Sequence, residues 1–235
     1  MIETLTIDDR LTFAVRRSEK RASLGITIDR DGKLILALPE DCSLEEGKSF
    51  ARSKRTWIYR KLAEKSLLRQ PRRPKRFVEG EGHYYLGRSY RIKLLDDPGA
   101  DTKALRLHQG RFVLRADAQA EAQEHFEHWY RTRGQAFVEK RLARFTDRLE
   151  VQPAGVDVRS LGYRWGSCSE SGRINIHWQT ALLPVRLIDY ILIHELAHLH
   201  EPSHDPRFWR RVERVMPDYQ QRKQELTEEG GGYLL

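Results

Sequence analysis

The sequence predicts an α+β protein. A β-rich N-terminal region with one helix and a basic linker (residues 1–116) precedes a second domain (residues 117–235). Three observations predict this arrangement. Short apolar segments separated by turn residues recur over the first hundred residues, as they do in sheets. From residue 118 onward the apolar residues follow helical spacing instead. A chain of 235 residues, 39% of them apolar, is long enough for one large or two small cores.

The N-terminal region begins with predicted strands. Residues 11–15 alternate apolar and polar side chains, and residues 24–28 and 34–38 flank an Asp-Gly pair that predicts a hairpin. Ser43 is a suitable N-cap for a helix to about residue 68. Residues 69–76 contain two prolines and five basic residues, which predicts an extended linker. Further strands are expected at 83–86, 90–95 and 105–114.

The second domain opens with a predicted helix over residues 118–149, which Gly134 could interrupt. Strands are expected at 156–160 and 173–178, and the second of these could present an edge to an extended peptide. Pro184 marks the first turn of the next helix. A last helical stretch covers residues 207–215. The glycine-rich tail at 230–232 is expected to fray.

Composition limits the function classes. Lysine and arginine outnumber aspartate and glutamate by 42 to 34, which favours anionic partners such as nucleotides or nucleic acid. Two cysteines exclude a disulfide scaffold and a multi-cysteine zinc ribbon. The acidic start lacks a signal peptide, and no apolar run approaches the ~20 residues that span a bilayer. We therefore expect a cytoplasmic protein that does not enter a membrane.

The strongest chemical signal is the pair His194 and His198, with Glu195 between them. Histidines four residues apart project from one helix face and can bind one zinc ion. Glu195 can then act as general base toward water at the open metal position. Such a pentapeptide also occurs by chance on solvated helices. The apolar segment before it, residues 187–193, favours a buried metal site instead.

The third ligand has two candidates. His204 follows His198 by six residues, and Glu201 follows it by three. Pro202 disfavours helical geometry at Glu201, so we expect a turn that returns His204 to the metal. His200 faces away from the metal on the helix. This histidine spacing equals that of metzincins, but Glu201 stands where they require glycine.

Several neighbouring residues are candidates for auxiliary roles. Tyr163, Arg164 and Tyr190 could stabilise an oxyanion, although packing is the simpler role for each. Asp205 could orient a ligand histidine or cap the following helix. Gly166 is expected to allow a turn or a close backbone approach.

The densest basic region lies between Arg52 and Arg76, with Trp57 and Tyr59 interleaved. Two explanations of this charge are open. The basic residues can form a solvated helix face and linker, or they can form a surface that binds nucleic acid or a nucleotide.

Taken together, these motifs resemble the YgjP-like metallopeptidase family and, more distantly, SprT-like and WLM-type proteases. The residues that carry the resemblance include Tyr163, Trp165, Gly166, Ser167, Cys168, Asn175, Trp178, Pro184, Asp189, Tyr190, His194, Glu195, Leu196, Ala197, His198, Leu199, His204, Phe208, Trp209, Pro217, Asp218 and Tyr219. The resemblance implies a zincin-like metallopeptidase domain, with an active-site helix under a short twisted sheet. By the family pattern, His194, His198 and His204 bind Zn²⁺ and Glu195 is the general base.

The resulting expectation is a zinc metallopeptidase in which Glu195 activates a zinc-bound water to cleave peptide bonds of a polypeptide substrate. Some family members are described as nucleotide pyrophosphohydrolases acting on UTP, so that activity is the alternative. Two further hypotheses are a nucleic-acid-associated protease and a non-catalytic nucleic-acid-binding protein that uses zinc structurally. Structural zinc normally has four protein ligands, so an open fourth position would argue against the last of these.

Overall fold

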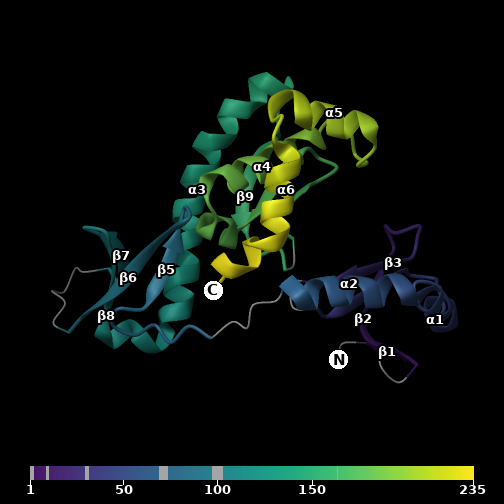
Figure 1. Ribbon diagram of the computed structural model, residues 1–235, viewed down its shortest axis with the longest axis horizontal. Coiled ribbons are helices and arrows are strands. Elements are labelled where there is room, and N and C mark those ends of the chain that lie inside the picture. The colour runs from purple at the N-terminus through teal and green to yellow at the C-terminus, as the bar shows by residue number, and fades with distance from the viewer. Residues whose placement is uncertain (1–2, 9–10, 30–31, 69–73, 97–102, 163) are drawn as a thin grey trace. The chain divides into compact units, whose positions relative to one another are not determined.

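The computed structural model describes residues 3–8, 11–29, 32–68, 74–96, 103–162 and 164–235. It is a mixed α/β fold with six α-helices in these ranges (Figure 1). The chain divides into two compact units, Met1–Pro71 and Arg72–Leu235. None of the helices in the described ranges is both long and apolar enough to span a bilayer.

The first unit is a four-stranded sheet followed by two helices. Its strands are β1 (Thr4–Ile7), β2 (Leu11–Ser18), β3 (Gly25–Ile28) and β4 (Leu34–Pro39), in the order β1-β2-β4-β3. The expected hairpin is confirmed, because β3 and β4 pair antiparallel with Ile28 opposite Leu34, while residues 30–31 between them lie outside the described residues. Alternate side chains of β1 and β2 enter a core that has Phe13 and Leu36 at its centre.

One predicted helix of this unit is two helices in the structure. Ser43 caps α1 (Leu44–Ser53) through a capping box with Glu46, as its sequence position predicted. The helix then ends at Lys54, and α2 (Arg55–Leu68) begins directly after it. Residues 69–73 of the predicted linker lie outside the described residues.

The second unit begins with a sheet of the same design. Strands β5 (Gly82–Tyr85), β6 (Arg88–Leu95), β7 (Leu105–His108) and β8 (Arg111–Arg115) take the order β5-β6-β8-β7. In both four-stranded sheets the middle pair is parallel and the two outer pairs are antiparallel. The single strand expected at 105–114 is therefore a hairpin, which turns at Gln109 and Gly110 with positive φ values of 47° and 73°.

This second sheet packs with the C-terminal part of the chain. Phe112 of β8 contacts Phe126 and Trp129, with ring centroids 5.0 and 4.9 Å apart. Ile92 of β6 belongs to the same apolar cluster. The unit boundary therefore lies near residue 71, whereas the sequence predicted a boundary at residue 116.

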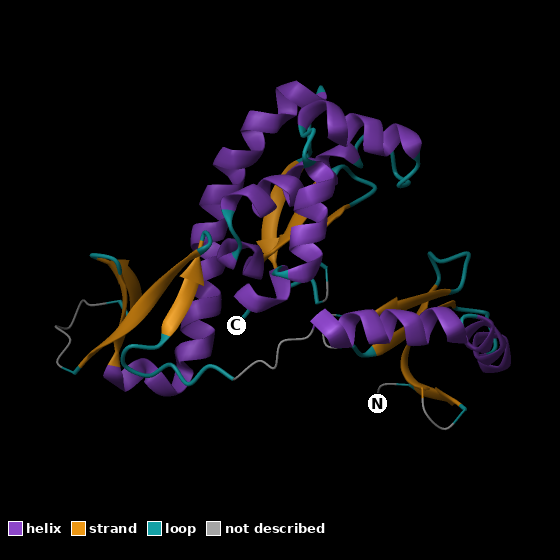
Figure 2. Ribbon diagram, in the orientation of Figure 1, coloured by secondary structure: helices purple, strands orange, loops and turns teal. Residues whose placement is uncertain are grey.

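A long helix, α3 (Ala122–Leu149), follows the short 3₁₀ helix η1 (Ala116–Glu121) and reaches both sheets of this unit (Figures 1 and 2). Gly134 does not interrupt it. A Cβ at this position would lie 3.5 Å from Val158 and 3.6 Å from Ala181, which is ordinary van der Waals contact. The other sheet of this unit has the order β10-β11-β9, from strands β9 (Gly155–Arg159), β10 (Gly166–Cys168) and β11 (Arg173–His177).

The remaining elements complete the core around one buried helix. The 3₁₀ helix η2 (Trp178–Leu182) leads into α4 (Val185–Ala197), in which residues 187–193 are all buried. Two further helices follow, α5 (Pro206–Val215) and α6 (Tyr219–Glu228). The tail forms a 3₁₀ helix, η3 (Gly230–Tyr233), with Gly230 and Leu234 buried. The expectation of a frayed tail is wrong, because Tyr233 packs on Tyr84 at 4.9 Å.

Candidate metal centre

Helix α4 presents the histidine motif at its C-terminal end. Its apolar residues anchor it in the core, so the last turn is held firmly. His194 lies within this turn and His198 is the C-cap residue, one turn further along. Glu195 is buried, with 7% of its surface exposed.

The chain then turns and brings His204 back to the other two histidines. Asp205 starts α5 directly afterwards, which fixes the end of the loop. The Nε2 atom of His204 lies 2.9 Å from Nε2 of His194 and 3.1 Å from Nε2 of His198. Two ligands of one tetrahedral zinc ion stand about 3.4 Å apart. The three side chains thus form a cluster of the size that one such cation requires.

Hydrogen bonding sets the tautomer of one member of this cluster. Nδ1 of His198 lies 3.0 Å from the backbone oxygen of Glu201. A carbonyl oxygen only accepts, so Nδ1 donates, and in the neutral ring the Nε2 lone pair faces His204. A partner of this kind typically orients a metal-binding histidine.

Burial favours the uncharged form of two of the three histidines, His194 and His204. It lowers the pKa of His194 to about 3, and the neighbouring His198 and His204 lower it further. Burial also lowers the pKa of His204, and the charges of His198 and Lys223 add to that shift. Neutral imidazoles with converging lone pairs repel one another and can all bind one cation. The chemistry of the donor set therefore fits a divalent metal.

Aromatic side chains support the three rings. The Phe208 ring lies between 4.6 and 4.9 Å from each of the three histidine rings, measured between centroids. Trp209 stacks on His204 at 5.7 Å, and its Nε1 donates to the His204 backbone oxygen at 3.1 Å. Lys223 of α6 covers the outer face of Trp209. These contacts anchor the loop that carries His204.

Glu195 faces the edge strand β10. A Cβ on Gly166 would lie 2.7 Å from both Cγ and Oε1 of Glu195, so only glycine fits beside the carboxylate. This is the close approach that the sequence predicted at Gly166. Burial raises the pKa of Glu195 to about 8, and the charge of Arg164 opposes that shift. The Glu195 carboxylate is thus shielded from water, and the residue directly follows His194 in the sequence.

The auxiliary candidates occupy different positions. Tyr163 lies outside the described residues. Arg164 is exposed and acts on Glu195 through its charge. Tyr190 is buried, with its ring centroid 5.9 Å from that of His194, and burial raises its pKa to about 12. Asp205 accepts hydrogen bonds from the backbone N–H groups of Arg207 and Phe208, which is a helix-capping arrangement.

The rival ligands point elsewhere. The Glu201 carboxylate lies 3.6 Å from Arg211, and the residue approaches the cluster through its backbone oxygen. Nε2 of His200 lies 3.2 Å from the backbone oxygens of Leu149 and Glu150, at the end of α3. Cys168 is half-buried, and burial raises the pKa of its thiol, with Glu195 adding to the shift.

The basic region between Arg52 and Arg76 belongs partly to the first unit. Arg52 and Arg55 each lie within 4 Å of the Asp8 carboxylate, at 3.8 and 3.4 Å. Local pairing thus neutralises part of the charge that suggested a nucleic-acid platform.

A polar contact that the sequence analysis missed holds α4 against α3. Arg141 donates to both carboxylate oxygens of Asp189, at 2.5 and 2.6 Å. An aspartate within an otherwise apolar helix was the available signal, because a buried carboxylate needs a partner. The partner itself is 48 residues away in the chain.

Comparisons with known proteins show which family the chain belongs to. The sequence profile of the YgjP-like metallopeptidase domain matches residues 22–229. Among solved structures, the crystal structure of the metallopeptidase zymogen of Pyrococcus abyssi abylysin is similar, with 33% sequence identity and a TM-score of 0.36. That match covers 38% of this chain and 90% of the other. No curated protein is significantly similar. Because the family profile spans most of the sequence, the chain belongs to the YgjP-like metallopeptidase domain family and is a metal-dependent hydrolase.

Proposed function

We propose that the protein is a zinc peptidase in which His194, His198 and His204 hold the metal and Glu195 moves the proton. The observation that carries this proposal is the convergence of the three histidine side chains, one of which directly precedes the buried Glu195 in the chain. Three histidines leave one position of a tetrahedral zinc ion open, as in catalytic rather than structural sites. The bound ion would supply Lewis acidity, which polarises a carbonyl and acidifies water.

Glu195 serves as the general base in this proposal. Its ionised carboxylate accepts a proton from the attacking water and returns it to the amine leaving group. Its buried position keeps bulk water from competing for that proton. Gly166 keeps the carboxylate in place, because strand β10 passes within van der Waals distance of it.

The substrate in this proposal is an extended polypeptide that adds to the edge of the three-stranded sheet. Residues 173–178 were expected to be able to present such an edge. The structure corrects this, because β11 is the central strand and the two edges are β10 and β9. A peptide paired with β10 would pass Glu195 at Gly166, and its backbone hydrogen bonds would not depend on its side chains.

The proposal is tested with Glu195→Gln. We expect this variant to retain one zinc ion per chain and to lose hydrolysis of unfolded polypeptides, because the amide cannot accept the proton. Glu213→Gln, an exposed change on α5, is the matched control and is expected to keep full activity. His204→Ala should lose stoichiometric zinc, measured by atomic absorption.

Two results would contradict the proposal. Polypeptide hydrolysis by zinc-loaded Glu195→Gln at the wild-type rate would remove Glu195 as the base. Hydrolysis of nucleoside triphosphates, but of no polypeptide, by the wild-type protein would replace peptide chemistry with phosphoanhydride chemistry.

A further inference from the structure

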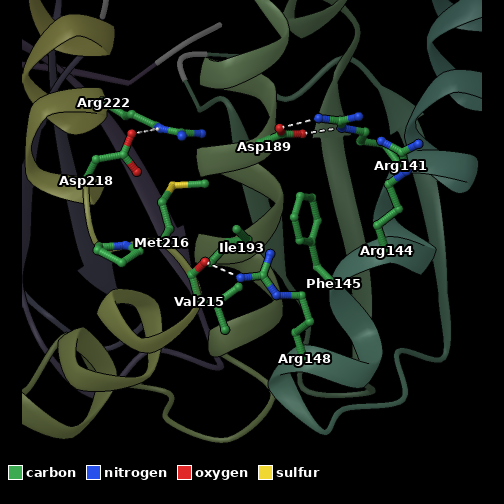
Figure 3. A pocket seen from close by; sticks show the side chains of 11 residues that line it. Arg141, Arg144, Phe145, Arg148, Asp189, Ile193, Val215, Met216, Asp218 and Arg222 are labelled. Carbon is green, nitrogen blue, oxygen red and sulfur yellow. Dashed lines mark hydrogen bonds and ion pairs between the residues drawn. The ribbon is translucent and has the colours of Figure 1, made fainter.

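A second concave site lies where α3, α4 and α6 meet (Figure 3). Its volume is about 360 Å³, at the lower end of the range for small-molecule pockets. Three arginines of α3 line it, together with Asp189 and Ile193 of α4 and Arg222 of α6. The turn between α5 and α6, which contains Met216 and Asp218, closes it.

The charges in this pocket do not balance. Arg141 is paired with Asp189, and Arg222 is paired with Asp218 at 2.7 Å. Arg144 and Arg148 remain. Arg148 donates one N–H to the Val215 backbone oxygen at 2.8 Å, which leaves its charge uncompensated. In the described part of the chain, no carboxylate pairs with Arg144 or Arg148, so four guanidinium groups and two carboxylates leave a formal charge of +2.

Helix geometry brings these arginines together. Residues 141, 144 and 148 follow i, i+3 and i+7 spacing, which places them on one face of α3. Like charges at such spacing destabilise a helix, and the apolar side chains of Phe145 and Ile193 in the same pocket strengthen the repulsion. An anion bound among them would relieve that cost.

The pocket is separate from the metal centre. Asp189 and Ile193 lie on one side of α4, and the histidines at 194 and 198 lie about 140° round the same helix. The pocket residues are therefore not part of the site that would bind the metal and the scissile bond.

We propose that this pocket binds a phosphate group. Its formal charge of +2 matches a dianion better than a single carboxylate. Guanidinium groups also fit phosphate oxygens with paired, charge-assisted hydrogen bonds. The volume leaves room for a small organic group on the phosphate, so the ligand is either free phosphate or a small phosphate monoester.

The test is titration calorimetry on the full chain at constant ionic strength, with inorganic phosphate, glycerol phosphate and acetate as probes. We expect both phosphates to bind more tightly than acetate. Arg144→Gln should weaken phosphate binding about tenfold, the loss expected for one charge-assisted contact. Arg131→Gln removes the same charge from α3 outside the pocket and should leave the affinity unchanged. Tighter binding of the ester or of the free ion identifies which of the two the pocket takes.

The zinc-loaded and chelator-treated proteins should give the same phosphate affinity, because the pocket contains no metal ligand. Phosphate binding that disappears on zinc removal and is unaffected by Arg144→Gln would place the anion on the metal and overturn the proposal. Absence of phosphate binding in the millimolar range would also overturn it.

Discussion

At the scale of single residues, Gly166 and Glu195 form the most restrictive contact of the metal centre. Gly166→Ala would place a methyl group 2.7 Å from the carboxylate, so Glu195 must move. Because displacement of a catalytic group by about 1 Å costs about a hundredfold in rate, we expect a loss of that order in kcat. Zinc content should stay at one ion per chain, since no ligand is touched.

Gly232→Ala is the matched control for this change. A Cβ at Gly232 meets no atom within 4 Å, so activity should be unchanged. Wild-type kcat in Gly166→Ala, measured with the same polypeptide substrate, would show that the side chain of Glu195 adapts and that its position is not critical.

Trp209 is a positioning residue for the third histidine. Trp209→Phe keeps a ring against His204 and removes the N–H that binds the His204 backbone oxygen. Groups that orient metal ligands contribute about tenfold or more to metal affinity. We therefore expect zinc to bind about tenfold more weakly, in competition with a chromophoric chelator. Trp57→Phe, at an exposed position of the first unit, should not change the affinity, and an equal loss in both variants would contradict this role.

Residue spacing was enough to anticipate the histidine cluster. Two histidines four apart on a helix share a face whatever surrounds them, and Pro202 predicted a turn before His204. The helix in fact ends earlier, at Ala197. The spacing could not show what packs beneath the rings, because the contacts of Phe208 with all three histidines depend on where α5 begins. The pocket that Arg144 and Arg222 line could not be predicted from the sequence either, since its members come from four helices and the turn between α5 and α6.

At the scale of elements, strand β5 carries a buried histidine that should make stability depend on pH. His83 is fully buried between Phe77 and Phe126, with ring centroids 5.2 and 4.5 Å away. Burial lowers its pKa to about 4, and the charge of Lys75 lowers it further. The folded state therefore stays unprotonated between pH 6.5 and 4, whereas the unfolded chain binds a proton there.

The sign follows from proton uptake by the unfolded chain. The contribution of buried His83 to the free energy of unfolding is fully present above about pH 6.5 and is lost as the pH drops toward 4. Between pH 7 and 4.5 the loss from His83 should be about 2 kcal/mol. This loss is measured by urea unfolding of the chelator-treated wild-type protein and of the chelator-treated His83→Leu variant, at both pH values. The wild-type free energy of unfolding minus that of the variant should fall by that amount from pH 7 to 4.5. A difference that does not depend on pH would rule out this role.

Elements whose partners are close in sequence were the predictable ones. The β3–β4 hairpin and the cap of α1 depend on residues within a few positions. The parallel pairs β2–β4, β6–β8 and β9–β11 were not foreseen, because the two strands of each pair are separated by another strand. The short strand β10 was missed for the same reason, since three residues carry no periodicity and pairing with β11 defines them.

At the scale of the whole molecule, two sheets with the same strand order occur in succession. Each is followed by helical chain, and in the described ranges the second sheet shares its unit with α3 and the candidate metal centre. Their cores are distinct apolar clusters with no residue in common. Sequence patterns grouped the two sheets because both are rich in strands. Packing separates them, since Ile92 and Phe112 complete the core that also contains α4.

This division predicts two unfolding transitions in differential scanning calorimetry of the full chain. Ile7→Val, in the core of the first unit, should lower only one transition, by about 4–8 °C for a cost near 1 kcal/mol. Ile92→Val makes the same change in the second unit and should lower only the other transition, by about 2–4 °C. Zinc should raise the transition that Ile92→Val lowers, because a ligand stabilises the unit that binds it. If the boundary lay near residue 116, both variants would lie in the same unit and would lower the same one of two transitions. If calorimetry gave a single transition that both variants lower, the two units would unfold as one.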